Sequence, residues 1–357
     1  MTNEPQGTGA TRRVGIVCTS AARERYFPPA EVARLEQFAE VSWLEFDGPD
    51  RATDTPDDVE SVERLTQFVP GLNALVVSYG APRVTDAILE AAPNLVVVGD
   101  THGDRFGARI DVEAAARRGV LTVDTTNGSS DPVAEWALAL ILIGLRNAGA
   151  HFRRLVAGEV LWPDRDVFLR DPGYLNGELT GKTVGLIAAG NVGRRLIELL
   201  APFRVNVLVF DPYAPIALAD AYGFEFATLE VVLAQSDVVV CLVPLTGQTR
   251  GMLGAHELGL IRDGAVFVNV SRGAVVDTPA LIAELSTGRF IACLDVVDPE
   301  PLAVDSPLRQ MPNVFLSPHI AGVTAAAEPR FFALMVDELH RCLTGLRPHF
   351  PLIPRER

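Results

Sequence analysis

Short apolar runs alternate with helix-like stretches along most of the chain, in two successive series. The first series extends from residue 13 to about residue 123, and the second from residue 184 to residue 316. Apolar runs of this length are typical of strands buried on both faces, and strand–helix alternation produces right-handed crossovers between parallel strands. The pattern therefore predicts an α/β fold with two doubly wound parallel sheets.

The apolar runs also give approximate boundaries for the elements. In the first sheet we expect strands at residues 14–18, 41–44, 74–77, 95–98 and 121–123, with helices at 29–39 and 85–92. In the second we expect six strands, near residues 184–187, 205–210, 238–243, 266–270, 291–294 and 314–316. A last amphipathic helix, residues 325–343, has an apolar face of Phe331, Phe332, Met335, Leu339 and Leu343. Because it follows a completed sheet, we expect it to return and cover the first one.

A chain of 357 residues fits two domains of ordinary size. The returning helix makes the first domain discontinuous, at residues 1–126 and 325–357, and leaves residues 127–324 for the second. Residues 1–12 are polar and are expected to form a loose tail. A long apolar helix at 131–145 would have Asp131 at its N-cap and Pro132 in its first turn. The polar stretch 151–180 is expected to be irregular, with Trp162 either packed or capping the cleft or an interface.

Charge and cysteine content exclude several classes of protein. The net charge is -14 and no basic stripe offsets it, which argues against nucleic acid or an anionic membrane as a partner. The longest apolar run, about residues 136–145, is half a membrane span, and the N-terminal residues contain no apolar signal core. The four cysteines form no CxxC pair and are expected to be buried free thiols. These features predict a cytoplasmic location.

A glycine-rich turn opens the second series. The run 183–187 leads into Ala188-Ala-Gly190-Asn-Val-Gly193, and a helical stretch follows. Gly190 would let the backbone approach a pyrophosphate, and Gly193 would let the helix pack on the strand. The next run ends at Asp211, whose carboxylate would accept hydrogen bonds from a ribose and repel a 2′-phosphate. The turn predicts NAD binding, with NADH preferred over NADPH. A packing turn without ligand, and Asp211 as a simple strand-end residue, are the alternatives.

Three polar residues, Arg272, Glu300 and His319, each follow a different apolar run in the last third of the chain. Carboxyl ends of parallel strands meet at one edge of a sheet, where ligands bind. There Arg272 would bind the carboxylate of a 2-oxo acid, and His319 would move a proton to or from its carbonyl oxygen. Glu300 would favour the protonated imidazole. An isolated Arg is more often a solvated cation and an isolated His a structural residue, so the hypothesis depends on all three converging.

The chain resembles the D-isomer-specific 2-hydroxyacid dehydrogenase family over about residues 70–325. The motifs that carry the resemblance are the glycine-rich turn and residues 133–140, 243–249, 269–277, 294–302 and 317–322. The resemblance implies a flavodoxin-like, discontinuous substrate domain and a Rossmann NAD-binding domain, with the active site in the cleft. It implies Arg272, Glu300 and His319 as catalytic residues. It also implies a homodimer formed through the NAD-binding domain by the helix at 131–145, although the apolar face of that helix could equally be internal core.

The same resemblance implies further binding residues. Cofactor contacts are expected at Gly190, Asn191, Val192, Gly193, Asp211, Val243, Pro244, Thr249, Val270, Ser271, Asp295 and Gly322, with Asp295 holding the nicotinamide carboxamide. For the substrate we expect contacts at Tyr79, Gly80, His102 and Gly103. His102, Asp104 and Arg105 lie in a loop, residues 99–110, that departs from the family pattern. They would either contact an unusual substrate or be solvated.

The expected activity is the interconversion of a small 2-oxo acid and a D-2-hydroxy acid. Two departures from the family pattern and two alternative functions bear on this expectation. The Ala188-Ala-Gly190 turn resembles the formate dehydrogenase branch, but Glu300 stands where that branch has Gln, which argues against formate. A non-catalytic NAD-sensing protein is one alternative, although such a protein would not need the catalytic residues. Action on another anion, such as a phosphonate, is the second, because of the altered loop.

Overall fold

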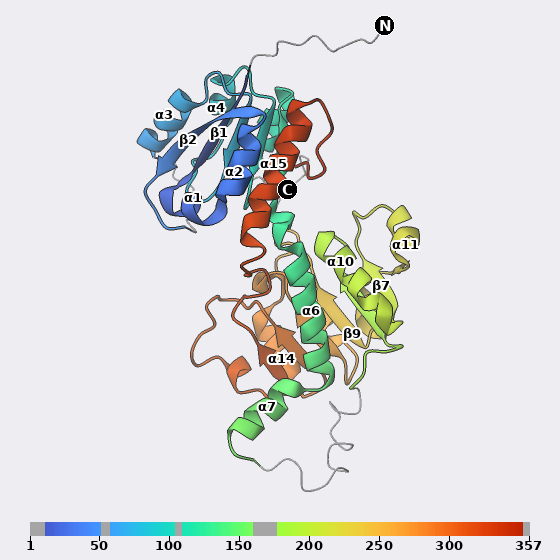
Figure 1. Ribbon diagram of the computed structural model, residues 1–357. Coiled ribbons are helices and arrows are strands. Elements are labelled where there is room, and N and C mark those ends of the chain that lie inside the picture. The colour runs from blue at the N-terminus through green and yellow to red at the C-terminus, as the bar shows by residue number, and fades with distance from the viewer. Residues whose placement is uncertain (1–10, 51–57, 104–108, 160–176, 353–357) are drawn as a thin grey trace. The chain divides into compact units, whose positions relative to one another are not determined.

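The computed structural model describes residues 11–50, 58–103, 109–159 and 177–352. The chain divides into two compact units, Met1–Ser129 with Ala325–Glu356, and Ser130–Thr324 (Figure 1). We call these the first and the second unit. Trp162, Asp104, Arg105 and nearly all of the expected N-terminal tail lie outside the described residues.

The first unit contains a five-stranded parallel sheet with the strand order β2-β1-β3-β4-β5. This is the flavodoxin-like order, in which the chain reverses direction across the sheet between β1 and β3. The strands are β1 (Arg12–Thr19), β2 (Ala39–Phe46), β3 (Ala74–Val77), β4 (Val97–Asp100) and β5 (Leu121–Asp124). All five expected strands are present, and β3 has the predicted bounds. Beyond β5, Pro351 adds an antiparallel bridge to Val123.

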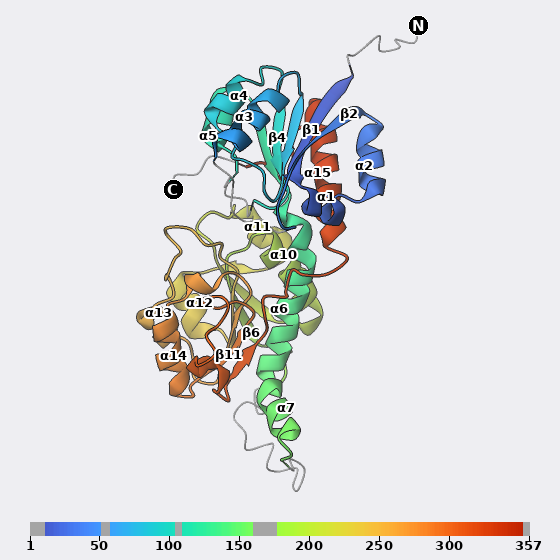
Figure 2. The ribbon, with the colours of Figure 1, turned by 90° about the vertical axis from the view of Figure 1, so that its left-hand side faces the viewer.

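Helices cover both faces of this sheet (Figure 2). One face is covered by α3 (Val59–Phe68), α4 (Asp86–Glu90) and α5 (Val112–Arg117), whose apolar side chains join one core. The other is covered by α1 (Ser20–Tyr26), α2 (Pro29–Glu36) and α15 (Glu328–Leu343). The α15 residues Phe332, Met335 and Leu339 are fully buried against that face. A short 3-10 helix, η1 (Thr126–Ser129), ends the N-terminal part of this unit.

The second unit contains a seven-stranded parallel sheet, with the order β12-β11-β10-β9-β6-β7-β8. Its first six strands along the chain have the Rossmann order 3-2-1-4-5-6, with the reversal between β6 and β9. The strands are β6 (Thr183–Ile187), β7 (Asn206–Phe210), β8 (Glu225–Phe226), β9 (Val238–Cys241), β10 (Val266–Asn269), β11 (Ile291–Leu294) and β12 (Val314–Leu316). The expected number of six strands is wrong by one, because β8 has only two residues and no apolar run marks it.

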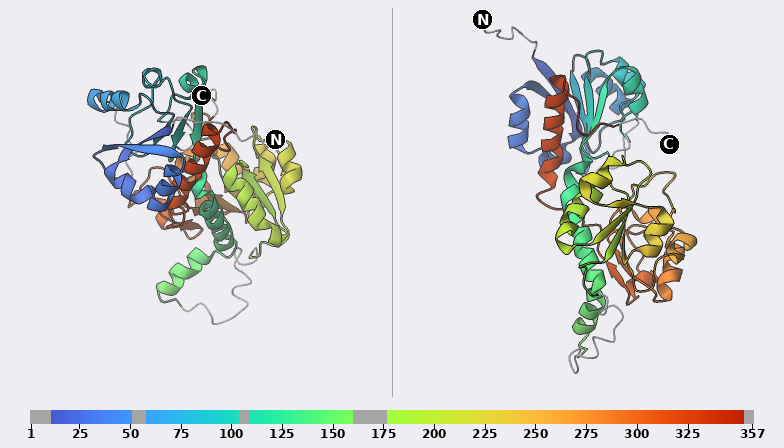
Figure 3. Two further views of the ribbon diagram at one scale, coloured as in Figure 1. Left: turned by 45° about the horizontal axis from the view of Figure 1, so that its top comes forward. Right: turned by 90° about the vertical axis from the view of Figure 1, so that its right-hand side faces the viewer.

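Two helical layers enclose this sheet (Figures 2 and 3). On one face lie α6 (Ser130–Leu145) and α10 (Asn191–Leu200), which share a core with the sheet, and α11 (Ala217–Tyr222) packs beside them. On the other lie α12 (Leu229–Gln235), α13 (Ala255–Gly259) and α14 (Thr278–Ser286). Short 3-10 helices are η2 (Ala201–Phe203), η3 (Gly273–Val275) and η4 (Pro307–Arg309). Helices thus cover both faces of this parallel sheet, as expected for a doubly wound fold.

Two expectations about the start of the second unit are wrong. Asp131 is not the N-cap of α6 but lies in its first turn, because the preceding 3-10 turn continues directly into the helix. Residues 151–156 are not irregular but belong to α7 (Ala148–Val156). That helix is only nine residues long and buries only Ala150, while Arg153 and Arg154 favour the negative end of its dipole.

The segment Thr126–Leu145 meets the length and hydropathy criteria for a membrane span, with 44% of the window buried. Within it, α6 packs on β10 and β11. At Gly144 the approach is so close that a Cβ atom would lie 2.4 Å from Val266. The apolar composition of α6 is thus used in the core of the second unit.

Candidate active site at the carboxyl edge of the second sheet

The glycine-rich turn follows β6, at the point where the strand order reverses. Ala188 has φ 89°, a conformation that favours glycine. A Cβ atom on Gly193 would lie 2.8 Å from the carbonyl oxygen of Ala188, so this glycine permits the close packing of helix and turn. Gly190 precedes the first residue of α10, and a Cβ atom there would meet nothing within 4 Å. The helix therefore begins next to open space, with backbone N–H groups that no side chain of Gly190 can cap.

Asp211, which follows β7, binds the same turn. One oxygen of its carboxylate accepts a hydrogen bond from the Ala189 N–H at 3.0 Å. The other accepts from the N–H groups of Tyr213 at 2.9 Å and Ala214 at 3.1 Å. The carboxylate thus ties the end of β7 to the turn after β6, a contact that the sequence analysis did not foresee. These contacts are those expected of a strand-end residue, the alternative interpretation of Asp211. The Asp211 side chain is still partly exposed.

The loop after β9 is held by its own side chains. The Thr249 hydroxyl donates to the carbonyl oxygen of Pro244 at 2.6 Å and accepts from the Thr246 N–H at 2.8 Å. Val243, before this turn, is buried, and Val192 in α10 packs against the core. The side chains of Val243 and Val192 therefore belong to the core of the second unit.

Arg272 lies in a tight turn after β10. Buried Asn269 holds this turn, since its amide donates to the Arg272 carbonyl at 3.2 Å and its oxygen accepts from the Ser271 N–H at 3.0 Å. Val270 and Ser271 are buried, and the partly buried Arg272 side chain donates to the Ser271 carbonyl at 2.8 Å. Asn269 was not expected to have a role at the site, although it begins the family motif at residues 269–277.

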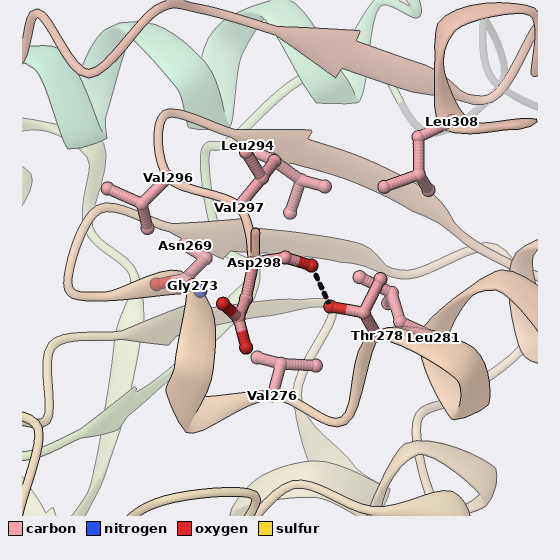
Figure 4. Close-up of a pocket in the computed structure, with 10 residues that line it drawn as sticks. All are labelled: Asn269, Gly273, Val276, Thr278, Leu281, Leu294, Val296, Val297, Asp298 and Leu308. Atoms are coloured by element: carbon pink, nitrogen blue, oxygen red, sulfur yellow. Dashed lines mark hydrogen bonds between the residues drawn. The ribbon is translucent and has the colours of Figure 1, made fainter. Parts of the chain in front are cut away.

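The turn that carries Arg272 packs directly on the loop that follows β11 and leads to Glu300. A Cβ atom on Gly273 would lie 2.0 Å from the backbone of Val297, so only glycine fits. The Thr278 hydroxyl donates to the Asp298 carbonyl at 2.8 Å, beside a small pocket (Figure 4). The pocket has a volume of about 10 Å³, which is room for one water molecule and too little for a substrate. The pocket therefore lies between the two loops.

Glu300 and His319 are in contact. The Nδ1 atom of His319 lies 2.7 Å from Oε1 of Glu300, and both side chains are about two-fifths exposed. A carboxylate only accepts hydrogen bonds, so Nδ1 carries the proton of this contact and Nε2 is the nitrogen left to exchange one. Arg272, Glu300 and His319 follow β10, β11 and β12, which are neighbours in the sheet.

Asp295 holds the loop that carries His319. It is 2% exposed, and its carboxylate accepts from the Ser317 hydroxyl at 2.5 Å and from the N–H groups of Ile320 at 3.1 Å and Ala321 at 3.0 Å. Its carbonyl oxygen accepts from the His319 N–H at 2.8 Å. His319 itself has φ 53°, in the left-handed region. The two residues after it lead to Gly322, which is partly buried.

The residues expected to contact substrate lie in the first unit, after β3 and β4. The His102 ring stacks on Tyr79 with centroids 4.4 Å apart, and Tyr26 and Phe331 lie at 4.8 and 4.6 Å. Beneath them, buried Asp100 forms an ion pair with buried Arg109 at 3.0 Å. His102 is therefore packed among aromatic rings, so the interpretation of it as a solvated loop residue is wrong.

Two glycines adjoin this aromatic cluster. Gly80 has φ 75°, a conformation that glycine adopts readily. A Cβ atom on Gly103 would lie 2.5 Å from the Asp100 carboxylate and 2.7 Å from that of Asp124. Both glycines are therefore needed for the path of the backbone at this edge of the first sheet.

Known proteins share sequence and fold with this chain. A model of the "D-isomer specific 2-hydroxyacid dehydrogenase, NAD binding domain" matches residues 138–321, more than half of the chain. The chain belongs to this family. It is 32% identical to a D-3-phosphoglycerate dehydrogenase of Archaeoglobus fulgidus over 80% of this chain and 52% of that protein. It is 33% identical to a formate dehydrogenase of Arabidopsis thaliana over 85% of this chain and 77% of that one.

A crystal structure of a phosphoglycerate oxidoreductase from Rhizobium etli has the same fold, with a TM-score of 0.79 and 25% identity over 97% of this chain and all of that one. The chain spans only about half the length of the phosphoglycerate dehydrogenases that it matches. The family and the fold are thus established.

Proposed function

We propose that this protein is an NAD-dependent oxidoreductase that interconverts a small 2-oxo acid and a D-2-hydroxy acid. The observation that carries the proposal is the 2.7 Å contact between His319 and Glu300 at the strand edge that also bears Arg272. An imidazole oriented by a carboxylate is a suitable acid or base for a carbonyl oxygen. Arg272 supplies the forked cation that binds a carboxylate.

The turn after β6 fits a dinucleotide. Open space at Gly190 and the N-terminus of the ten-residue helix α10 would receive the pyrophosphate. Asp211 would accept hydrogen bonds from the ribose, and its charge would repel the 2′-phosphate of NADPH. We therefore propose Gly190, Asn191, Val192 and Gly193 as the phosphate-binding segment and Asp211 as the residue that selects NADH.

The protein's own groups would bind the acid and move one proton. Arg272 would bind the carboxylate of the 2-oxo acid and orient its carbonyl group. Bound NADH would supply the hydride that reduces the carbonyl carbon. His319 would donate the proton on Nε2 to the oxygen, on which negative charge develops. Glu300 would hold Nδ1–H throughout, and in the reverse direction neutral His319 would take the proton from the hydroxyl group.

A screen of NADH consumption tests this function. The acids are glyoxylate, hydroxypyruvate, pyruvate, phenylpyruvate and bulkier 2-oxo acids, and 3-phosphoglycerate and formate are tested with NAD in the opposite direction. Turnover of at least one 2-oxo acid is expected, together with loss of substrate capture but not of NADH binding in Arg272→Ala. NADH binding without turnover of any acid would indicate an NAD-sensing protein instead. Collapse of NADH affinity in Arg272→Ala would refute the role given to Arg272.

We also propose that the protein forms a homodimer through the second unit and works in the cytoplasm. One face of α6 is used in the core, but α7 presents Phe152 and Val156, which are 67% and 72% exposed. Exposed apolar groups this large are typical of an interface. Phe152→Asp should shift the mass measured by light scattering from dimer to monomer, and an unchanged mass would exclude this face. The four buried free thiols suit a reducing compartment.

A further inference from the structure

Trp136, on α6, begins a chain of hydrogen bonds that ends at the loop of His319. Its indole N–H donates to the Ser317 hydroxyl at 3.1 Å. The Ser317 hydroxyl in turn donates to Oδ1 of Asp295 at 2.5 Å. Asp295 accepts from Ile320 and Ala321, the two residues that follow His319. Four elements, α6, β11, β12 and the His319 loop, are thus connected through polar side chains.

Both ends of this chain are fixed. The Trp136 side chain is partly buried and packs against the core that α6 shares with the sheet, which limits movement of its ring. Asp295 continues β11 beside β10, since its N–H donates to the Asn269 carbonyl at 3.0 Å. A buried carboxylate is costly unless donors surround it, so Asp295 draws the Ser317 hydroxyl and the two loop N–H groups toward itself.

The geometry of His319 explains why such a support is needed. Its φ of 53° is sparsely populated by residues with a Cβ atom and persists where the surroundings determine it. The loop N–H groups bound to Asp295 are those of the next two residues, so they fix the backbone on the C-terminal side of this conformation. A shift of the loop would move the imidazole away from Glu300.

We infer that Trp136 and Ser317 are positioning residues that act through Asp295 to hold His319 in its working geometry. The two residues do not touch the reacting atoms. The indole N–H fixes the rotamer of the Ser317 hydroxyl, so that this hydroxyl points its proton at Asp295. The catalytic part of the inference rests on the proposed function, and the structural part does not.

Two variants and a rescue test the inference. Ser317→Ala removes the central hydroxyl, Trp136→Phe removes only the indole N–H and keeps a ring, and Ser317→Thr restores a hydroxyl. Matched controls are Ser286→Ala, whose hydroxyl bonds only within α14, and Trp43→Phe on β2. Hydrogen exchange of the amides of residues 317–323 is measured by mass spectrometry, together with kcat, KM for the 2-oxo acid and the dissociation constant of NADH.

We expect faster exchange at Ile320 and Ala321 in Ser317→Ala and, to a smaller degree, in Trp136→Phe. In the same variants kcat should fall on the order of 10-fold, because a misplaced catalytic group costs turnover. NADH affinity should stay near the wild-type value, Ser317→Thr should restore both properties, and the controls should match wild type. Unchanged exchange in both variants would overturn the inference.

Faster hydrogen exchange together with an unchanged kcat would overturn the catalytic part of the inference. If the wild-type protein turned over no acid, the proposed function would fail. The exchange measurement would still decide whether Trp136 and Ser317 hold the loop, so the two failures are distinguishable.

Discussion

Nδ1 of His319 lies 2.7 Å from Oε1 of Glu300, although these residues follow different strands of the second sheet. The contact leaves Nε2 as the nitrogen that would exchange a proton with a substrate. The hydrogen bond to the Glu300 carboxylate also orients the imidazole.

Replacing Glu300 by Gln tests this orienting role. The amide oxygen can still accept from Nδ1, but the negative charge beside the imidazole is gone. We expect turnover in the direction of reduction to fall, because a hydrogen bond to a neutral amide is weaker than one to a carboxylate and holds the imidazole less firmly. Steady-state kinetics measure this, with Glu198→Gln as the control. A variant with the wild-type turnover would mean that the charge of Glu300 has no part in the reaction.

Alanine at the two glycines of the proposed phosphate-binding segment should affect different properties, NADH affinity at Gly190 and stability at Gly193. At Gly190 a Cβ atom meets nothing within 4 Å, so Gly190→Ala should fold normally but bind NADH more weakly, because the methyl group occupies the space for the pyrophosphate. At Gly193 the Cβ atom would lie 2.8 Å from a carbonyl oxygen. Gly193→Ala should therefore lower the free energy of unfolding, by about 1–3 kcal/mol for overpacking.

Urea unfolding measures the stability of both variants and NADH titration measures their affinity, with Gly259→Ala in α13 as the control. Wild-type NADH affinity in Gly190→Ala would remove the pyrophosphate from this turn.

Asp211→Asn should reduce the preference for NADH over NADPH. The substitution removes the charge that repels a 2′-phosphate and keeps one oxygen for the N–H groups of the adjacent turn. Because Asp211 also accepts from the Ala189 N–H, the free energy of unfolding must be measured alongside the two dissociation constants. If the NADH to NADPH ratio is unchanged in a stable variant, selection of the ribose lies elsewhere.

The buried thiols predict lower stability in alkali. Burial raises the pKa of Cys18 and Cys293 from the ordinary 9.0 to about 12, and that of Cys342 to about 11. Above pH 9 the thiols of the unfolded chain lose their protons while the folded chain keeps them. The unfolded state then binds fewer protons, so the free energy of unfolding falls as the pH rises toward 12.

Urea unfolding between pH 8 and pH 10.5 should show this decline, and Cys293→Ala should make it less steep. Identical slopes for the two proteins would mean that Cys293 ionises equally well in the folded state.

Much of the fold could be predicted because a strand buried on both faces of a sheet appears in the sequence as a continuous apolar run. The strand at residues 74–77 is apolar throughout and was assigned its observed bounds. β8 was missed because its two residues, Glu225 and Phe226, do not form an apolar run. α7 was missed because it has only nine residues within a longer polar stretch, and its apolar residues Phe152 and Val156 are exposed rather than part of a core.

The placing of the candidate site residues could be predicted from the sequence in part. The positions of Arg272, Glu300 and His319 after neighbouring strands follow from parallel topology. The link from Trp136 through Ser317 to Asp295 does not, because it joins residues up to 181 positions apart through side-chain rotamers that no periodicity records. His102 shows the same limit, since its packing among aromatic rings depends on α1 and α15 meeting at one edge of the first sheet.

The central claim, that His319 is the proton donor and acceptor, is tested most directly by the turnover of His319→Ala with the best 2-oxo acid and NADH. We predict a loss of at least about 100-fold, the lower end for general acid catalysis, with NADH affinity retained. A variant that reduces the acid at the wild-type rate would contradict the account.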